Sequence, residues 1–355
     1  MTWPRNCYVT TWVHVTATRP SPPQPGREDM ALHDSFKQKT LARVVSVEGV
    51  GLHGGAPVQV VLRPDRSGRG LVFRRLDLER QAAWSGGRRM RVEIPAAASC
   101  VTHSDHATTL TARTPAGDAS VQTVEHLLAA LHVMEVDACI VEIDGPEVPI
   151  LDGSAAPWVA LVRSAGLRTA DRPRRVRRIV EPFSVTSGDS SISAYPASGL
   201  RVTCSIAFSH PAIGTEERSW LVTPETFARE LAPARTFGFL RDVEQLRAAG
   251  LVKGGSLENA VVLDDTKVIN GPLRFEDEFV RHKAMDLLGD LALMGAPLVG
   301  HVVARRAGHR LHAEFARQLL ASPAHWRLEP AGRASEELST VVAGSAEMAL
   351  PASHE

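Results

Sequence analysis

The sequence predicts an α+β protein of two similar domains, each a mostly antiparallel sheet packed on a pair of helices. The length of 355 residues allows two ordinary domains. In each half, strand-like runs follow one another before a helix begins, and this order is typical of α+β folds rather than of βαβ alternation. An arginine-rich stretch at residues 168–178 separates the two halves.

Breaks in the patterning give the expected boundaries. A proline-rich run at 21–26 cannot continue a helix or a central strand, and Met30 offers an alternative start of the chain. Six of the eleven residues at 168–178 are arginine, and we favour a solvated linker over a phosphate-binding strip there. The expected extension at 1–36 is either disordered or mis-annotated, with Met30 as the true start. The other expected segments are domain I at 37–167, the linker at 168–178, domain II at 179–330 and a flexible tail at 331–355.

Composition excludes several classes of protein. Acidic and basic residues balance at 40 each, so no net charge attracts nucleic acid or an anionic membrane. The four cysteines are widely spaced and form no CxxC motif, which fits a reducing compartment. The sequence contains neither an apolar run of about 18 residues nor the apolar core of a signal peptide. We therefore expect a cytoplasmic protein.

Apolar periodicity and turn residues predict the elements of each half. In the first half we expect Thr123 and Ser154 to act as helix N-caps. The predicted elements there are a strand at 42–47, a glycine-rich turn at 49–55, a strand at 58–62, a helix from 123 through 131, a strand at 138–143 and a helix at 155–162. The second half is expected to contain strands at 179–185, 191–194 and 200–208, a helix at 224–231, a strand–helix–strand excursion at 237–263, a long helix at 276–294, a strand at 298–304 and a helix at 311–320.

The long predicted helix carries the most informative polar residues. His282, Asp286 and Asp290 are spaced at i, i+4 and i+8 and therefore share one helix face. A histidine and a carboxylate one turn apart can chelate a metal ion, as the two histidines of HExxH helices do. A surface His–Asp pair explains the same spacing, and from the spacing alone it is the better interpretation.

Three further segments hold candidate residues with ordinary alternatives. Glu125 and His126 open an otherwise apolar helix, where the carboxylate could compensate the helix dipole and the imidazole could be a core residue. Thr236 could present its hydroxyl to an oxyanion or cap the next helix. His309 and His312 flank a basic turn that suits acid–base chemistry, although for His312 we favour a surface turn.

Taken together, these segments resemble the zinc-dependent UDP-3-O-acyl-N-acetylglucosamine deacetylases of lipid A biosynthesis over about residues 38–320. The sequence departs from the usual family pattern at Ala56 and Ser190, where the family tends to have basic residues. The matching stretches are GLHG at 51–54, TVEHL at 123–127, VPILDGSA at 148–155, ARTFGF at 234–239, LRFEDEF at 273–279, His282-Lys283 with Asp286, Gly289-Asp290 and Gly308-His309.

The resemblance implies an active site between the two domains. His126, His282 and Asp286 would be the ligands of one zinc ion, with a fourth position left for water as a catalytic zinc requires. Glu125 is similar to the family's general base. His309 is similar to the cationic partner that protonates the leaving amine or stabilises the oxyanion.

The remaining assignments also follow from the resemblance. Asp290 would orient His309, Thr236 would donate to the oxyanion, and Lys283 would add an active-site charge whose catalytic or structural role stays open. Arg306 stands where the family often has a basic residue near the diphosphate. The excursion at 237–263 would form a tunnel for the acyl chain, with walls that include Phe237, Leu240, Val252, Leu257, Ala260 and Val262.

The implied reaction is hydrolysis of the N-acetyl group of UDP-3-O-(3-hydroxyacyl)-N-acetylglucosamine to acetate and a free amine. The expected partner is that substrate alone, with no nucleic acid, and the expected state is a cytoplasmic monomer with transient contact at the inner membrane left open. Two alternatives stay open beside it. One is a non-catalytic relative that binds a UDP-sugar or lipid, and the other is a different amidohydrolase on the same scaffold.

Overall fold

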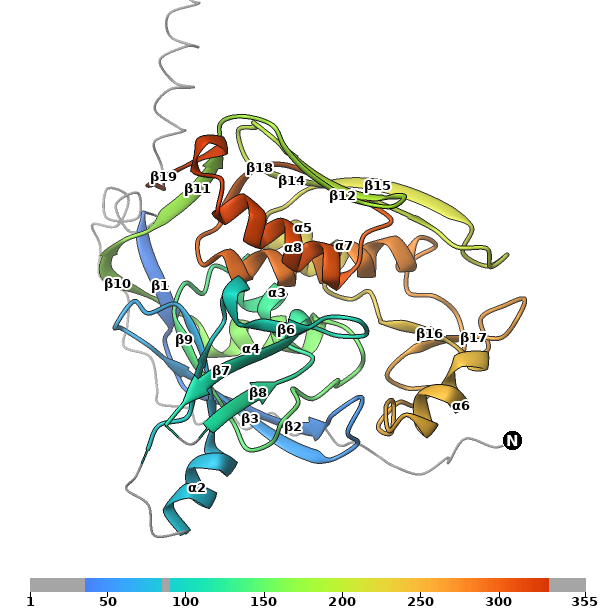
Figure 1. The fold of residues 1–355 in the computed structure, drawn as a ribbon, viewed down its shortest axis with the longest axis horizontal. Coiled ribbons are helices and arrows are strands. Elements are labelled where there is room, and N and C mark those ends of the chain that lie inside the picture. The colour runs from blue at the N-terminus through green and yellow to red at the C-terminus, as the bar shows by residue number, and fades with distance from the viewer. Residues whose placement is uncertain (1–35, 85–89, 116, 332–355) are drawn as a thin grey trace, which may run out of the picture.

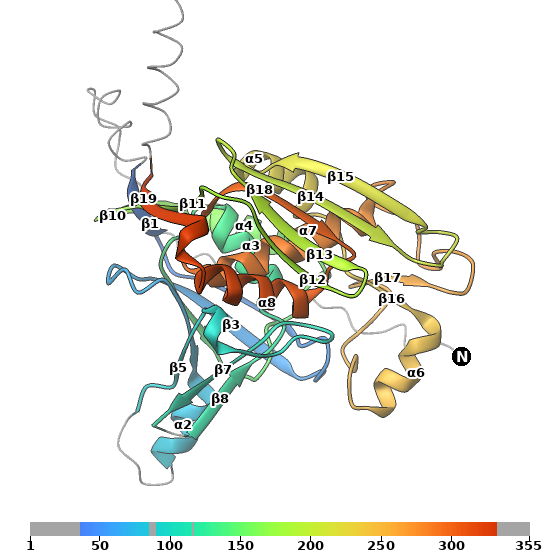
Figure 2. The ribbon, with the colours of Figure 1, turned by 45° about the horizontal axis from the view of Figure 1, so that its top comes forward.

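The computed structural model describes residues 36–84, 90–115 and 117–331. The predicted extension and tail lie outside these residues, apart from positions 36 and 331. The structure is α+β as predicted, with 27% of the chain in helices and 38% in strands. Two sheets lie on opposite sides of a central layer of helices (Figures 1 and 2).

The first domain contains a five-stranded sheet in the order β2-β3-β9-β4-β5. Only the pairing of β4 with β9 is parallel. A separate three-stranded sheet, β6-β7-β8, precedes helix α3. The elements are β1 (Lys37–Leu41), β2 (Val45–Val50), β3 (Pro57–Pro64), β4 (Leu71–Arg75), α2 (Leu76–Trp84), β5 (Glu93–Pro95), η1 (Ala98–Cys100), β6 (Val101–His103), β7 (Thr109–Thr114), β8 (Gly117–Val121), α3 (Glu125–Val133), β9 (Cys139–Ile143) and α4 (Ala156–Ala165).

The second domain repeats this connectivity. Its sheet contains the path β12-β13-β18-β14-β15, in which only the pairing of β14 with β18 is parallel. Strands β11 and β19 extend the sheet beside β18. The elements are β10 (Leu167–Pro173), β11 (Arg175–Ile179), β12 (Phe183–Ser187), β13 (Ser190–Tyr195), β14 (Leu200–Ala207), β15 (Thr215–Leu221), α5 (Pro224–Thr226), η2 (Phe227–Leu231), β16 (Phe237–Phe239), α6 (Leu240–Ala248), β17 (Val261–Leu263), α7 (Glu278–Leu291), η3 (Ala292–Met294), β18 (Leu298–Arg305), α8 (His309–Leu320), η4 (Pro323–His325) and β19 (Trp326–Pro330).

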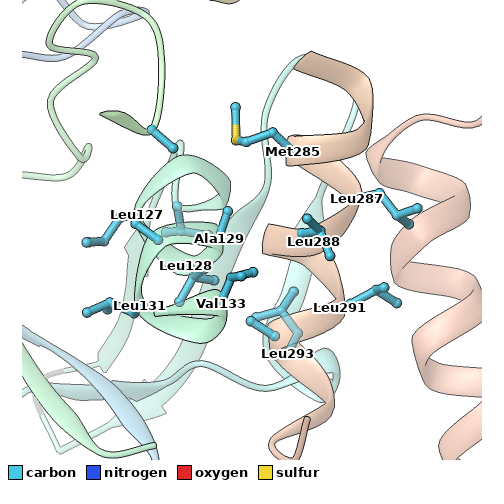
Figure 3. Packing of buried hydrophobic residues seen from close by; sticks show 14 of the residues in the cluster. Leu127, Leu128, Ala129, Leu131, Val133, Met285, Leu287, Leu288, Leu291 and Leu293 are labelled. Atoms are coloured by element: carbon cyan, nitrogen blue, oxygen red, sulfur yellow. The ribbon is translucent and has the colours of Figure 1, made fainter. Parts of the chain in front are cut away.

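Helices α3 and α7 occupy equivalent places in the two domains, and they pack directly against each other. Figure 3 shows Ala129 and Val133 on the side of α3 nearer α7, and Leu288 on the side of α7 nearer α3. Leu127 and Leu131 point away from α7, and both are also 0% exposed. Helix α3 is apolar around its whole circumference because both domains cover it. Glu125 and His126, at its N-terminus, are therefore held inside the molecule, and His132 in its last turn is half-buried.

Most of the predicted elements are confirmed to within a few residues, but two local predictions are wrong. Thr123 is not the N-cap of α3, which is Val124. Thr123 adopts a positive φ of 58°, and its hydroxyl donates to a carboxylate instead of accepting from the helix. The N-cap of α4 is Ala155 rather than Ser154, although the Ser154 hydroxyl does accept from the Ala156 backbone N–H at 3.2 Å.

The arginine-rich stretch is not a solvated linker. It forms strands β10 and β11, and β10 pairs with β1 at the start of the chain. Arg174 is 9% exposed because Glu135 and Asp137 bind its guanidinium at 2.8 and 2.9 Å. Arg177 is 6% exposed and stacks on Trp326. Carboxylates and an aromatic ring from distant parts of the sequence thus allow these arginines to be buried.

Candidate metal centre and acid–base site

Two histidines and an aspartate converge where α3 meets α7. The Nε2 atoms of His126 and His282 lie 3.5 and 3.4 Å from Oδ1 of Asp286. Ligands bound tetrahedrally to one metal ion at about 2.1 Å lie about 3.4 Å from one another. All three side chains are buried, at 5%, 2% and 1% exposure. The spacing of the three atoms therefore fits a single metal ion without rearrangement.

The hydrogen bonds of these residues leave Nε2 of His282 and Oδ1 of Asp286 free to bind a metal ion. The backbone carbonyl of Ala234 lies 3.1 Å from Nδ1 of His282, which places the proton there and directs the Nε2 lone pair into the cluster. Oδ1 of Asp286 is buried and has no hydrogen-bond partner among the described residues, whereas Lys283 donates to its Oδ2 at 3.0 Å. An orphaned carboxylate oxygen between two imidazoles is what a missing cation would leave.

The protonation states also suit a metal. Burial lowers the pKa of His282 to about 4, so the imidazole is neutral at pH 7. Burial would raise the pKa of Asp286, but His282, Lys283 and His309 outweigh it and hold that pKa well below its usual range. A neutral imidazole and an ionised carboxylate are the ligand forms that bind divalent metals.

A buried carboxylate sets the direction in which α3 enters the site. Glu147 is 4% exposed and accepts the backbone N–H groups of His53 and Gly54, each at 2.8 Å, and the Thr123 hydroxyl at 3.0 Å. Thr123 needs this support because its φ of 58° is costly for a β-branched residue. The strained turn ends two residues before Glu125, so it aims the first turn of α3 at α7.

Close approach of the two helices brings His126 within reach of Asp286. A Cβ atom at Gly289 of α7 would lie 2.1 Å from the carbonyl oxygen of Glu125. Real Cβ atoms do not approach this closely, so any side chain at position 289 would push α3 away. The glycine therefore fixes the separation between the ligand from α3 and the ligands from α7.

Glu125 lies beside the metal cluster and is buried at 3% exposure. Its Oε2 accepts the backbone N–H of Thr108 at 3.0 Å. Burial raises its pKa, and the charges on His309 and His126 oppose that rise. A carboxylate whose pKa is raised towards neutrality is a better proton acceptor than an exposed one.

A second cluster lies one turn further along α7, around Asp290. Oδ2 of Asp290 lies 2.7 Å from Nδ1 of His309 and 2.8 Å from Nδ1 of His312, and Oδ1 accepts the Thr108 hydroxyl at 2.6 Å. Burial alone would lower the pKa of His309, but Asp290 and Asp286 raise it to about 9. The pKa of Asp290 is about 2, because the two histidines outweigh the effect of its burial. At neutral pH the structure thus holds an imidazolium–carboxylate pair.

The interpretation of His312 as a surface residue is wrong. Its side chain is 1% exposed, because α8 begins at His309 and not at Leu311. His309 and His312 therefore occupy the same helix face at i and i+3. Both direct an Nδ1 atom at Asp290, and burial lowers the pKa of His312.

An ion-pair network holds the segment that carries Thr236. The buried carboxylate of Glu278 binds Arg235 through its backbone N–H and its guanidinium at 2.9 Å, and it accepts the backbone N–H of Arg274 at 2.6 Å. The Thr236 backbone N–H donates to the carbonyl of Gly153 in the first domain at 2.8 Å. These contacts fix Thr236 at the wall of a cavity that Lys283 also lines.

That cavity has a volume of about 900 Å³ and lies between the two domains. Its described lining includes both imidazoles and the carboxylate of the metal cluster, together with Glu125, His309, Phe237 and Arg306. The other predicted wall residues of the acyl tunnel do not line this cavity. They belong to the β16–α6–β17 excursion beside it, with Val262 buried and Leu240 38% exposed; the remaining members are Val252, Leu257 and Ala260.

Comparison with known proteins agrees with this geometry. Residues 38–321 match the family described as LpxC, UDP-3-O-acyl N-acetylglycosamine deacetylase. A protein from Myxococcus xanthus named UDP-3-O-acyl-N-acetylglucosamine deacetylase is 46% identical over 300 residues, covering 84% of this chain and 91% of its own. Proteins of the same name from Syntrophotalea carbinolica and Thermosynechococcus vestitus are 41% and 46% identical, covering 88% and 79% of this chain and 97% and 93% of their own.

The chain belongs to the UDP-3-O-acyl N-acetylglycosamine deacetylase family. Sequence reasoning placed the residues that surround the cavity but missed three buried ones that position them in this deacetylase. Thr108 and Glu147 were not considered, and His312 was assigned to the surface. The spacing of three between His309 and His312 could have placed both on one helix face, had the helix been predicted to begin after Gly308 as its N-cap.

None of the helices in the described ranges combines the length and the apolar character needed to cross a bilayer.

Proposed function

We propose that this chain is a zinc-dependent hydrolase that removes the N-acetyl group of UDP-3-O-(3-hydroxyacyl)-N-acetylglucosamine, the committed step of lipid A biosynthesis. Family membership supports the substrate. The observation that carries the chemistry is the unsatisfied Oδ1 of Asp286 between the imidazoles of His126 and His282, with a general base and a cation beside them. We further propose that the protein acts as a cytoplasmic monomer that meets its acylated substrate at the inner membrane.

The proposed ion is a single Zn²⁺ held by His126, His282 and Asp286. When bound there, it would polarise the amide carbonyl and lower the pKa of the attacking water. Lys283 donates to Oδ2 of Asp286, so Oδ1 is the oxygen that would be left to bind the ion. Two nitrogen ligands and one oxygen ligand with an open fourth position are typical of hydrolytic zinc sites.

The protein's own residues would move the protons. Glu125 is placed to take a proton from the attacking water as the new C–O bond forms. His309, held as a cation by Asp290, is placed to give a proton to the amine nitrogen as the C–N bond breaks. Thr236 stands where its hydroxyl could donate to the developing oxyanion. The products are acetate and the free amine.

Thr108 connects the two halves of this machinery. Its backbone N–H donates to Glu125 and its hydroxyl donates to Asp290. One residue therefore fixes the proposed general base, Glu125, relative to Asp290, the carboxylate that binds His309. Arg306 lines the same cavity with its guanidinium 3.5 Å from Asp189, and we propose that it contacts the substrate's diphosphate. The insert at 237–263 would accept the acyl chain.

Metal analysis and acetate release test the proposal together. We expect about one zinc ion per chain and a chelator-sensitive release of acetate. Glu125→Ala should abolish turnover while zinc remains bound, because Glu125 is beside the cluster and not one of its three ligand atoms. Absence of both zinc and activity in the native protein would overturn the proposal, and loss of zinc in Glu125→Ala would make Glu125 a ligand.

Substrate length separates this function from the alternatives. Binding of the acyl chain near the insert should make turnover fall steeply as the chain is shortened. Equal turnover of short and long acyl substrates would favour a different amidohydrolase. Tight binding of the substrate with no acetate released at any zinc concentration would indicate a non-catalytic relative.

A further inference from the structure

Helix α2 ends in a tryptophan that the fold does not use. Trp84 is 93% exposed, whereas the next most exposed large hydrophobic residue in the described chain, Leu221, is 51% exposed. No residue of α2 is buried. Figures 1 and 2 show the helix projecting from the end of the first domain. An indole so placed contributes almost nothing to folding, which suggests that it serves an interaction.

The acidic residues of α2 are both paired with arginines of β4. Asp77 binds Arg75 at 2.6 Å, and Glu79 binds Arg74 at 2.7 Å. Both carboxylates have pKa values below their usual range: burial opposes this, and the arginine partners outweigh it. Arginines of β4 therefore neutralise both carboxylates, although Asp77 lies beside Arg80 and Trp84 on one side of the helix.

Two arginines of this region, Arg80 on α2 and Arg91 before β5, have no close carboxylate partner among the described residues. Arg80 is exposed and has no ion pair with the described residues, and the Arg91 side chain is 69% exposed with its nearest carboxylate oxygen, on Glu93, 3.9 Å away. From position 80 to position 91 the sequence contains four arginines, one tryptophan and no acidic residue. The whole chain is neutral, so this concentration of positive charge is local.

We propose that Trp84 and Arg80 of α2, together with Arg91 before β5, dock on an anionic phospholipid surface, an inference that rests on the proposed function for its purpose. Indole rings settle at the boundary between water and the acyl region, and arginines bind the phosphates above it. In both views α2 and the insert helix α6 project from the side of the molecule opposite strands β12–β15 (Figures 1 and 2). Docking there would present the insert to a substrate whose acyl chain lies in the bilayer.

Sedimentation with vesicles tests the docking surface directly. The full chain is mixed with vesicles of phosphatidylcholine and phosphatidylglycerol at 3:1, or of phosphatidylcholine alone. We expect binding to the anionic vesicles only, loss of that binding in 0.5 M NaCl, and at least fivefold weaker binding of Trp84→Ala and of Arg80→Gln/Arg91→Gln. Thermal unfolding should be unchanged, since the exposed indole buries almost no surface.

A matched control comes from the opposite domain. Arg201 and Leu221 are register partners on β14 and β15, and both are exposed, so they also combine an arginine with an exposed apolar residue. Arg201→Gln/Leu221→Ala should bind vesicles within twofold of the native chain. Equal loss in this control would show that any exposed pair suffices and would overturn the assignment to α2.

Other occupants give different results, and each would overturn the proposal. A dimer that Trp84→Ala converts to monomer, with vesicle binding unchanged, would make α2 a contact between copies. Competition by millimolar inorganic phosphate would make it a site for free phosphate. Native-like vesicle binding by both α2 variants would exclude it altogether.

Activity distinguishes failure of the docking surface from failure of the proposed function. Trp84→Ala should lower acetate release from vesicle-embedded substrate by at least fivefold and leave turnover of fully dissolved substrate unchanged. Equal rates on embedded substrate would overturn the role of docking. Absence of acetate release by the native chain from either substrate would sink the proposed function, while the sedimentation result would still decide the surface.

Discussion

Two clusters of the same composition lie one turn apart on α7, and they are built for different tasks. Each contains one aspartate and two histidines, and each brings three potential ligand atoms within 4.8 Å of one another. Around Asp286, one carboxylate oxygen has no hydrogen-bond partner. Around Asp290, both oxygens accept hydrogen bonds, from Thr108 on one side and from two imidazoles on the other.

The difference lies in where the imidazole protons point. His282 has its Nδ1 directed at a backbone carbonyl, so its Nε2 lone pair faces Asp286. His309 and His312 direct Nδ1 at Asp290 itself. In the first arrangement a carboxylate oxygen and an imidazole lone pair face each other, which suits a cation between them. In the second arrangement imidazole N–H groups occupy the carboxylate oxygen. Residue composition alone therefore does not separate a metal site from an acid–base site.

Removing the carboxylate of the first cluster should have the largest effect. Asp286→Asn should weaken metal binding by more than about 100-fold, because even residues that only orient ligands cost 10- to 100-fold. Metal content after dialysis measures this, and activity should fall with it. If Asp286→Asn kept its metal while Asp290→Asn lost it, the roles of the two clusters would have to be exchanged.

The equivalent change in the second cluster should spare the metal. Asp290→Asn removes the charge that keeps His309 cationic, so kcat should fall by about 10²- to 10⁴-fold, the usual contribution of general acid–base catalysis. Steady-state kinetics on protein of confirmed metal content gives the comparison. Nearly native kcat in this variant would show that the imidazolium does not take part.

A smaller effect is expected from the residue that joins the clusters. Thr108→Val deletes the hydroxyl bound to Asp290 and should lower kcat about tenfold, since hydrogen bonds to charged groups contribute about 1.5–3 kcal/mol. KM should change little, and Thr108→Ser should restore the rate. A rise in KM with kcat intact would place Thr108 in substrate binding instead.

The mildest change should come at His312. His312→Leu leaves Asp290 with one donor fewer and should destabilise folding by about 1–3 kcal/mol in urea unfolding, with a several-fold loss of kcat. His312→Asn can still offer an N–H near the same place and should retain more of both. Equal stability of the leucine variant and the native chain would mean that the His312–Asp290 contact contributes nothing.

The sequence was sufficient for the parts of the site that helical spacing and apolar patterning determine. Helical spacing brought His282, Asp286 and Asp290 to one face, and the structure has them there. The apolar run after Glu125 predicted a buried helix, and it is buried. The strand–helix–strand excursion also appears, as β16, α6 and β17.

What the sequence missed depends on contacts between distant residues. Thr108 lies between β6 and β7 in a stretch without any motif, and its importance comes from partners 17 and 182 positions away. Thr123 looked like a helix cap, but Glu147 captures its hydroxyl and the backbone turns to positive φ. Arg174 looked solvated because its carboxylate partners, Asp137 and Glu135, precede it by 37 and 39 positions.

Gly289 shows how the effect of a substitution in this protein can be misjudged. It would be classed as a helix-interior residue remote from chemistry, and a helix-propensity scale would recommend alanine there as an improvement. Yet the added methyl group would meet the backbone of Glu125 at 2.1 Å and displace α3. A screen that scored only side-chain contacts would pass such a variant, whereas one that measured bound metal after purification would reject it.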